Sequence, residues 1–135
     1  MVKLNKAEYD MILAHARACL PEEACGLIAG RREGENAVVE KVYLLENADR
    51  SREHFTMTPQ AQLDAVRDMR LKGLTPLGNW HSHPESPSRP SEEDKRLAYD
   101  GGAHYLILSL MTDPPTLNSF RIRGGESEKE ELIIE

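Results

Sequence analysis

The chain has 135 residues, of which 39% are hydrophobic and 30% are charged, and its formal net charge is −6 at pH 7. This composition predicts one domain over residues 1–135 with a single core and a charged surface. The acidic balance argues against a nucleic-acid backbone as the main partner, because phosphate binding needs clustered Lys and Arg. No apolar run approaches the ~20 residues of a membrane span, and the N-terminus lacks the apolar core of a signal peptide, so we expect a cytoplasmic protein.

The first half of the chain predicts two helices and two strands. Asn5 and Glu8 have the spacing of a helix N-terminal cap pair, and an apolar helical face follows until Pro21. Gly34 and the charges around it suit a hairpin turn between the two strands, and Gly73 ends the second helical pattern. The expected elements are a helix over residues 6–19, strands over 24–30 and 37–45, and a helix over 59–72.

The second half begins with a strand that runs into His81. Three prolines between positions 84 and 90 forbid a regular helix directly after it. Gly101 and Gly102 suit the C-terminus of a further helix. The remaining expected elements are a helix over residues 91–99 and strands over 105–111 and 117–123.

Gly124 and Gly125 are interpreted as a turn, and the tail that follows is charged until Leu132, Ile133 and Ile134. No second domain or repeat is apparent. Together these elements predict an α+β sandwich in which a central mixed sheet is flanked by helices. The sequence carries no signal of the oligomeric state.

Four side chains within fourteen residues indicate a hydrolytic metal site: His81, His83, Ser91 and Asp94. Two imidazoles at i and i+2 share a metal only on an extended segment, because on a helix they would diverge by about 200°. Ser91 has the chemistry of a helix N-cap, and Asp94 then falls in the first helical turn. The stiff proline loop can return Asp94 over His83.

Two histidines and one carboxylate leave a fourth tetrahedral position for water, which is typical of catalytic zinc sites. Such a water becomes a nucleophile near neutral pH, but a carboxylate is still needed to carry its proton to the leaving amine. Glu22 and Glu23 precede a short buried strand pattern at 24–30. They point to opposite faces, and spacing alone does not decide which one meets the metal.

The segment Pro21–Gly30 reads P-x-E-A-C-G-L-I-x-G, and His81–Asp94 reads H-S-H-P-(x6)-S-x-x-D. Both resemble motifs of the JAMM (MPN-domain) metalloprotease family, and the similarity of arrangement extends over nearly the whole chain. The resemblance implies a cytidine-deaminase-like fold. It also implies roles for five residues: zinc ligands at His81, His83 and Asp94, a general acid/base at Glu23, and an oxyanion-stabilising hydroxyl at Ser91.

Short connections leave little room for the insertions with which polyubiquitin-cleaving members grip their substrate. The chain is therefore similar to stand-alone prokaryotic members, which implies a ubiquitin-like or sulfur-carrier protein as partner and cleavage of the peptide bond after its C-terminal Gly-Gly. An isopeptidase that removes ubiquitin-like modifiers from lysine is one alternative. A non-catalytic scaffold is another, although a scaffold needs none of the five residues. A DNA-repair role is disfavoured by the acidic charge.

An extended substrate tail could pair with a sheet edge beside the metal, with residues 47–55 and 85–89 as candidate rims. Cys19 and Cys25 are expected to be free thiols, and Cys25 shares strand parity with Glu23, so it could lie near the metal although packing is the simpler role. The three other histidines are expected to be ordinary surface or core residues: His15, His54 and His104.

Overall fold

The structure is a computed structural model that describes residues 1–135. It contains three helices and eight strands, and no helix has the length and apolar character needed to cross a membrane. In chain order the elements are β1 (Val2–Leu4), α1 (Lys6–Cys19), β2 (Cys25–Glu33), β3 (Asn36–Leu45), α2 (Pro59–Leu71), β4 (Thr75–His83), α3 (Glu92–Arg96), β5 (His104–Ser109), β6 (Thr116–Arg123), β7 (Glu126–Glu130) and β8 (Leu132–Ile134).

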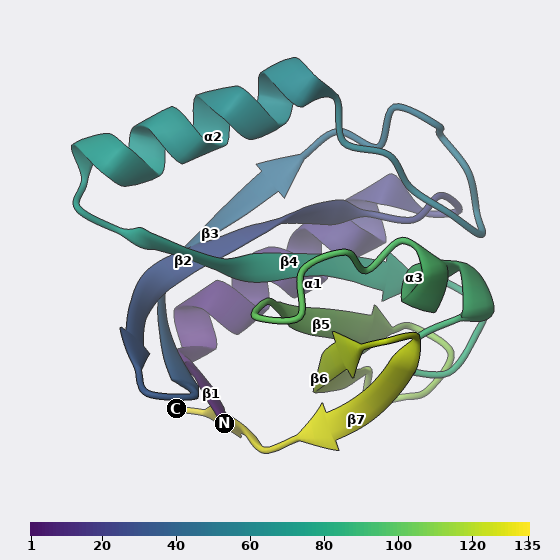
Figure 1. Cartoon of the computed structure of the whole chain (residues 1–135). Coiled ribbons are helices and arrows are strands. Elements are labelled where there is room, and N and C mark those ends of the chain that lie inside the picture. Colours follow the sequence, from purple (N-terminus) through teal and green to yellow (C-terminus); the bar gives the residue numbers. More distant parts are fainter.

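The eight strands form one mixed sheet in the order β7-β6-β5-β4-β2-β3-β1-β8. Its interior strand β4 runs antiparallel to β2 and parallel to β5. Helix α1 packs on one side of the sheet and α2 on the other (Figure 1). Ile12 and Ala16 are buried on the inner face of α1, and Ala65 and Met69 are buried on the inner face of α2. The predicted α+β sandwich is confirmed.

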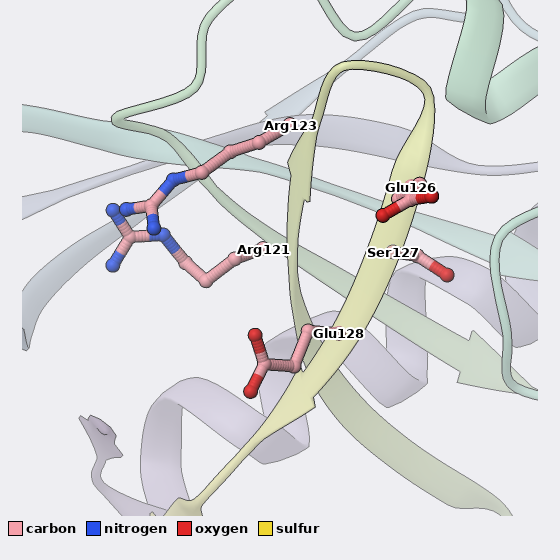
Figure 2. A pocket seen from close by; sticks show the side chains of 5 residues that line it. All are labelled: Arg121, Arg123, Glu126, Ser127 and Glu128. Carbon is pink, nitrogen blue, oxygen red and sulfur yellow. The ribbon is translucent and has the colours of Figure 1, made fainter.

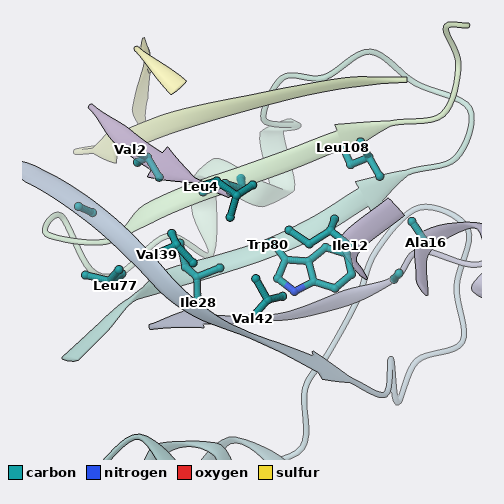
Figure 3. Close-up of a cluster of buried hydrophobic side chains, with 13 residues drawn as sticks. Val2, Leu4, Ile12, Ala16, Ile28, Val39, Val42, Leu77, Trp80 and Leu108 are labelled. Carbon is teal, nitrogen blue, oxygen red and sulfur yellow. The ribbon is translucent and has the colours of Figure 1, made fainter. Parts of the chain in front are cut away.

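The main core lies between α1 and the sheet and is centred on Trp80, which is fully buried (Figure 3). The Trp80 indole Nε1 donates a hydrogen bond of 3.0 Å to the Tyr43 carbonyl oxygen. Between them lies Gly26, where a Cβ atom would stand 1.7 Å from that carbonyl oxygen and 2.4 Å from Nε1. Only glycine fits there, so this position in the first motif allows β2 to lie tightly between β3 and β4.

The predicted helix over 6–19 is confirmed, and Asn5 and Glu8 form the expected capping box. The strands predicted at 24–30 and 37–45 and the helix at 59–72 agree with β2, β3 and α2, with β2 running on to Glu33. The helix predicted over 91–99 is too long, because α3 ends at Arg96. Its C-cap is Leu97, and the next residue, Ala98, packs on the apolar cluster around Ile107.

Three strands were not predicted, namely β1, β7 and β8. Gly124 and Gly125 do form a turn, with φ angles of 60° and 78°, and the charged tail then returns as β7 beside β6. The last strand, β8, pairs with β1 at the opposite end of the strand order. Most side chains of β7 are exposed, so β7 has no apolar pattern and is a strand only through its pairing with β6.

The carboxyl group of Glu130, at the end of β7, has three polar neighbours: the N-terminal ammonium group of Met1 lies 3.1 Å from its Oε1, and two further groups lie at its Oε2. Its Oε2 lies 2.7 Å from His104 Nδ1 and accepts a hydrogen bond of 2.9 Å from the Ser119 hydroxyl. Burial alone would raise the pKa of Glu130, but these hydrogen bonds outweigh it and lower the pKa to about 2. His104 is fully buried, so its predicted role as an ordinary core histidine agrees with the structure.

Candidate active site

Strand β4 presents His81 and His83 on the same face of the sheet, and the loop after it returns Asp94 to them. The two Nε2 atoms lie 3.0 Å apart. Asp94 Oδ2 lies 3.2 Å from Nε2 of His81 and 3.3 Å from Nε2 of His83. Both imidazoles are buried. The structure therefore brings together the three side chains that the sequence predicted as metal ligands.

This triangle fits a metal ion. Ligand atoms that bind a tetrahedral zinc at about 2.0–2.2 Å lie roughly 3.3 Å from one another, close to the three separations observed. Two imidazole nitrogens and one carboxylate oxygen are also a donor set that zinc accepts. His81, His83 and Asp94 could together hold such an ion.

The ligand atoms are oriented by neighbouring backbone groups. His83 Nδ1 lies 2.8 Å from the carbonyl oxygen of Pro87, which can only accept, so Nδ1 carries the proton and Nε2 presents its lone pair to the site. Asp94 Oδ2 accepts a hydrogen bond of 2.9 Å from the Ser91 backbone N–H. The proline-rich loop thus supplies the orienting contacts for two of the three side chains.

Ser91 is the N-cap of α3, as the sequence predicted, and its Oγ accepts a hydrogen bond of 3.0 Å from the Asp94 backbone N–H. Burial would raise the pKa of Asp94, but hydrogen bonds with His81 and His83 dominate and hold that pKa well below its usual range. Asp94 is therefore ionised over the whole neutral range, as a metal ligand has to be.

Glu23, rather than Glu22, faces the histidines. The segment before β2 is fixed to β4 at Ser82, whose Oγ accepts from the Ala24 N–H at 2.8 Å and whose N–H donates to the Ala24 carbonyl at 3.0 Å. Ser82 lies between the two histidines, so these bonds set the position of Glu23 relative to both. Sequence reasoning did not select Ser82, although its place inside H-S-H was a signal.

The Glu23 carboxyl group is unusual for its burial without a partner. The residue is 3% exposed, and its Oε1 has no hydrogen-bond partner. Burial raises the pKa of Glu23 to about 8, and the charge of Asp94 adds to the effect while His83 opposes it. Such a group can take up and release a proton near neutral pH.

The loop between β3 and α2 covers the site and is organised by Asn47. The Asn47 side chain donates to the carbonyl oxygens of Glu23 and His54, at 3.1 and 3.0 Å, and its Oδ1 accepts from Thr56 N–H. Phe55 stacks on His81 with ring centroids 4.7 Å apart. The sequence offered residues 47–55 as a rim but did not single out Asn47 or Phe55.

Two cavities flank the metal ligands. The polar hollow, of about 490 Å³, has no apolar residue and is lined by Glu23, Arg52, Glu53, His54, His83, Glu85, Ser86, Ser91 and Glu93. The apolar cavity, of about 50 Å³, is lined by Phe55, Asn79, His81, Asp94, Leu97, Tyr105, Ile107 and Ile122. Both predicted rims contribute to the polar hollow. His54, expected to lie away from the ligands, shares this hollow with His83.

The expected sheet edge beside the metal is absent. β4 is paired with β2 on one side and with β5 on the other up to the histidines, and the two edges of the sheet are β7 and β8. A substrate tail therefore cannot extend the sheet by pairing with β4.

Both cysteines are free thiols, as predicted. Cys25 is buried opposite His81 in the strand register, and its Sγ lies 3.9 Å from the Leu45 carbonyl oxygen. Burial raises the pKa of Cys25 to about 12. A thiol that stays protonated is a poor metal ligand, so packing is the role that the structure supports.

A third hollow, of about 340 Å³, lies away from the metal ligands on the β6–β7 hairpin (Figure 2). The guanidinium groups of Arg121 and Arg123 lie side by side there, and each has a nitrogen 3.2 Å from Glu35 Oε2. Both also donate to the Gly101 carbonyl oxygen. These arginines are thus engaged by the protein itself, and the hollow contains none of the predicted site residues.

Comparison with known proteins places this site in a family. Residues 5–123 match the family of prokaryotic homologs of the JAB domain. The chain is 34% identical over 127 residues to the CysO-cysteine peptidase of Mycobacterium tuberculosis, covering 93% of this chain and 85% of the relative. It is 32% identical over 105 residues to a desampylase of Haloferax volcanii, covering 74% of each.

Solved structures agree. A protein of Desulfitobacterium hafniense superimposes with a TM-score of 0.93 at 51% identity, covering 100% of this chain and 93% of that one. A JAB1/MPN domain protein of Archaeoglobus fulgidus shares the fold, with a TM-score of 0.66 at 23% identity over 98% and 97% of the two chains. The chain therefore belongs to the JAMM (MPN-domain) metalloprotease family and is an enzyme of its peptidase class.

Proposed function

We propose that this enzyme is a zinc metallopeptidase that hydrolyses the bond after the C-terminal Gly-Gly of a ubiquitin-like or sulfur-carrier protein. The bond is either a peptide bond, as the sequence suggested, or an isopeptide bond to lysine. The relatives named a CysO-cysteine peptidase and a desampylase support a substrate of this general kind. The two alternatives share the same acyl side and differ in the leaving amine.

The observation that carries this proposal is the position of the Glu23 carboxyl group. It is buried, its Oε1 is unpartnered, and it opens on the same hollow as His83 and Ser91. A general base without a partner beside a group of metal ligands is what proton transfer in amide hydrolysis requires. A non-catalytic scaffold would gain nothing from this arrangement.

His81, His83 and Asp94 would hold the zinc ion. When bound, zinc supplies a Lewis acid for a water molecule and for the substrate carbonyl. Glu23 accepts the proton released by the attacking water and delivers it to the departing amine nitrogen. Ser91 Oγ already accepts from the Asp94 N–H, so its own proton is free to be donated to the oxyanion.

The apolar cavity supports a glycine-ended tail. It borders His81 and Asp94, has a volume of only about 50 Å³, and is walled by Phe55, Leu97 and Tyr105 among others. A small, mostly apolar space favours a segment without side chains over one with branched or aromatic side chains. A Gly-Gly tail has this character.

The test measures zinc content and cleavage of a carrier protein ending Gly-Gly-Cys by the wild type, Glu23→Ala and His81→Ala. Glu22→Ala is the matched control, because it removes the same group from the neighbouring residue. We expect one zinc per chain in all but His81→Ala, and cleavage only by the wild type and the control. Zinc-free wild-type protein, purified without chelator, would overturn the metal assignment. A zinc-loaded Glu23→Ala variant that still cleaves would overturn the role of Glu23.

A further inference from the structure

The two cavities beside the metal ligands differ in chemistry. The apolar cavity is small and mostly hydrophobic, whereas the polar hollow is about ten times larger and contains no hydrophobic residue. A bond cleaved between them would have its acyl part on one side and its amine part on the other. The two parts of the substrate therefore meet different surfaces.

Glu23 decides which side receives the leaving group. As the proton donor to the departing nitrogen, it has to lie within hydrogen-bond reach of that atom. Glu23 lines the polar hollow and is not part of the apolar cavity. Its unpartnered Oε1, in a residue only 3% exposed, has no other group of the protein to satisfy it. This argument rests on the proposed function and assigns the polar hollow to the leaving side.

The walls of the polar hollow carry an excess of negative charge. Outside Glu23, three carboxylates face it, from Glu53, Glu85 and Glu93, against one arginine, Arg52. The Arg52 guanidinium lies 3.7 Å from the Glu85 carboxylate, so this cation is already opposed. The only other basic group close to a wall carboxylate is His54, whose Nδ1 is 3.9 Å from Glu93. The net charge of the walls of the polar hollow is therefore negative.

We propose that the polar hollow selects positively charged leaving segments, so that a lysine-linked conjugate flanked by basic residues is cleaved in preference to a leaving group that carries a free carboxylate. Negative walls stabilise a nearby cation and repel an anion, and the effect reaches several ångströms because the hollow is only partly open to solvent. A lone terminal amino acid brings its α-carboxylate close to these glutamates. A lysine side chain brings no carboxylate.

The competing interpretation is that Arg52 binds the α-carboxylate of a departing amino acid. Arg52 would then have to exchange Glu85 for the substrate while two further glutamates remain near by. The Arg52 side chain is 63% exposed and that of Glu85 is 75% exposed, so solvent weakens both charges alike and the number of charges of each sign decides. The charge balance favours the cationic leaving segment.

The test compares one carrier domain ending Gly-Gly, linked through lysine Nε to two peptides, Arg-Lys-Arg and Glu-Lys-Glu, both blocked at their ends. We expect kcat/KM to be about tenfold higher for the basic conjugate at low salt, and the difference to shrink as salt is added. Glu53→Gln combined with Glu93→Gln should bring the two rates within about twofold. Arg52→Gln should widen the difference, and Glu126→Gln combined with Glu128→Gln, a remote change of the same charge as the double variant, should leave it unchanged.

A second measurement does not depend on cleavage. The two peptides are titrated into the zinc-loaded enzyme, and backbone NMR shifts are followed. The basic peptide should perturb residues 52–54 and 85–93, and the acidic peptide should not. Equal cleavage of both conjugates would refute the charge selection and leave the proposed function standing. Faster cleavage of the acidic conjugate would have the same meaning. Equal binding of the two peptides would refute the charge selection even if neither conjugate is cut. A failure to cut either conjugate would count separately against the proposed function.

Discussion

Glu23, which is buried, and Glu130, which is half-buried, have opposite surroundings. Glu130 receives hydrogen bonds on Oε2 from His104 and Ser119, and its pKa falls to about 2. Glu23 has an unpartnered Oε1, and burial raises its pKa to about 8. The pKa of the same side chain is thus lowered at one place and raised at the other. The deeper burial of Glu23 and the hydrogen-bond partners of Glu130 together make the difference.

Replacing Glu23 should have the largest effect on activity. Glu23→Gln keeps the shape of the side chain but cannot accept a proton, so we expect kcat to fall by about 10³-fold with zinc content unchanged. The metal-free variant should be no less stable than the wild type, because no buried hydrogen bond of Oε1 is lost. Cleavage assays and denaturant titrations check both points. A marked loss of stability would show that Glu23 has a structural role.

Replacing Glu130 should do the reverse. Glu130→Gln replaces the charged acceptor of the His104 and Ser119 contacts by a neutral amide, which weakens both hydrogen bonds. We expect the free energy of unfolding to fall by about 2 kcal/mol. Cleavage by the folded variant should match that of the wild type, because none of the site residues contacts Glu130. Urea unfolding and initial rates below the transition provide the measurement, and a reduced kcat in fully folded protein would contradict it.

The two glutamates should also respond to pH in opposite senses in metal-free protein. Glu130 has a lowered pKa, so its stabilising contribution is present above about pH 4.5 and is lost as pH falls toward 2. Glu23 has a raised pKa, so the folded state binds its proton more tightly and stability declines as pH rises from about 4.5 to 8. Free energies of unfolding measured from about pH 2 to about pH 9 should show both slopes. Each slope should flatten in the matching glutamine variant.

The smallest effect is expected at Ser119. Ser119→Ala removes one of the two hydrogen bonds to Glu130 Oε2 and leaves the one with His104, so about 1 kcal/mol of stability should be lost. Combining it with Glu130→Gln should cost less than the sum of the two, because both act on one contact. Additive losses in a double-mutant cycle would mean that Ser119 stabilises the fold in another way.

The sequence predicted those parts of the molecule whose signals are local. Helix α1 was predicted by its capping box, and the clustering of His81, His83 and Asp94 by their spacing on a strand followed by a capped turn. Strands β1 and β8 were missed because their partners lie far away in the chain, and β7 was missed although its partner β6 directly precedes it. β7 shows only charged and polar residues, and β1 has three residues that pair with β3 and β8.

At the site, the choice between Glu22 and Glu23 could not be made from spacing. It depends on hydrogen bonds between Ala24 and Ser82, which are 58 residues apart. The position of His54 in the polar hollow likewise depends on Asn47, which holds its carbonyl oxygen. Long-range polar contacts of this kind leave no periodic trace in the sequence.

The buried indole of Trp80 has a practical consequence. It is the single tryptophan of the chain, it adjoins His81, and its Nε1 is bonded to the Tyr43 carbonyl across the core. His15 meets it edge-on with ring centroids 5.9 Å apart. Its fluorescence should therefore shift to longer wavelength when the core opens. The unmodified enzyme carries an optical probe of its own unfolding one residue away from His81, a member of the candidate metal site.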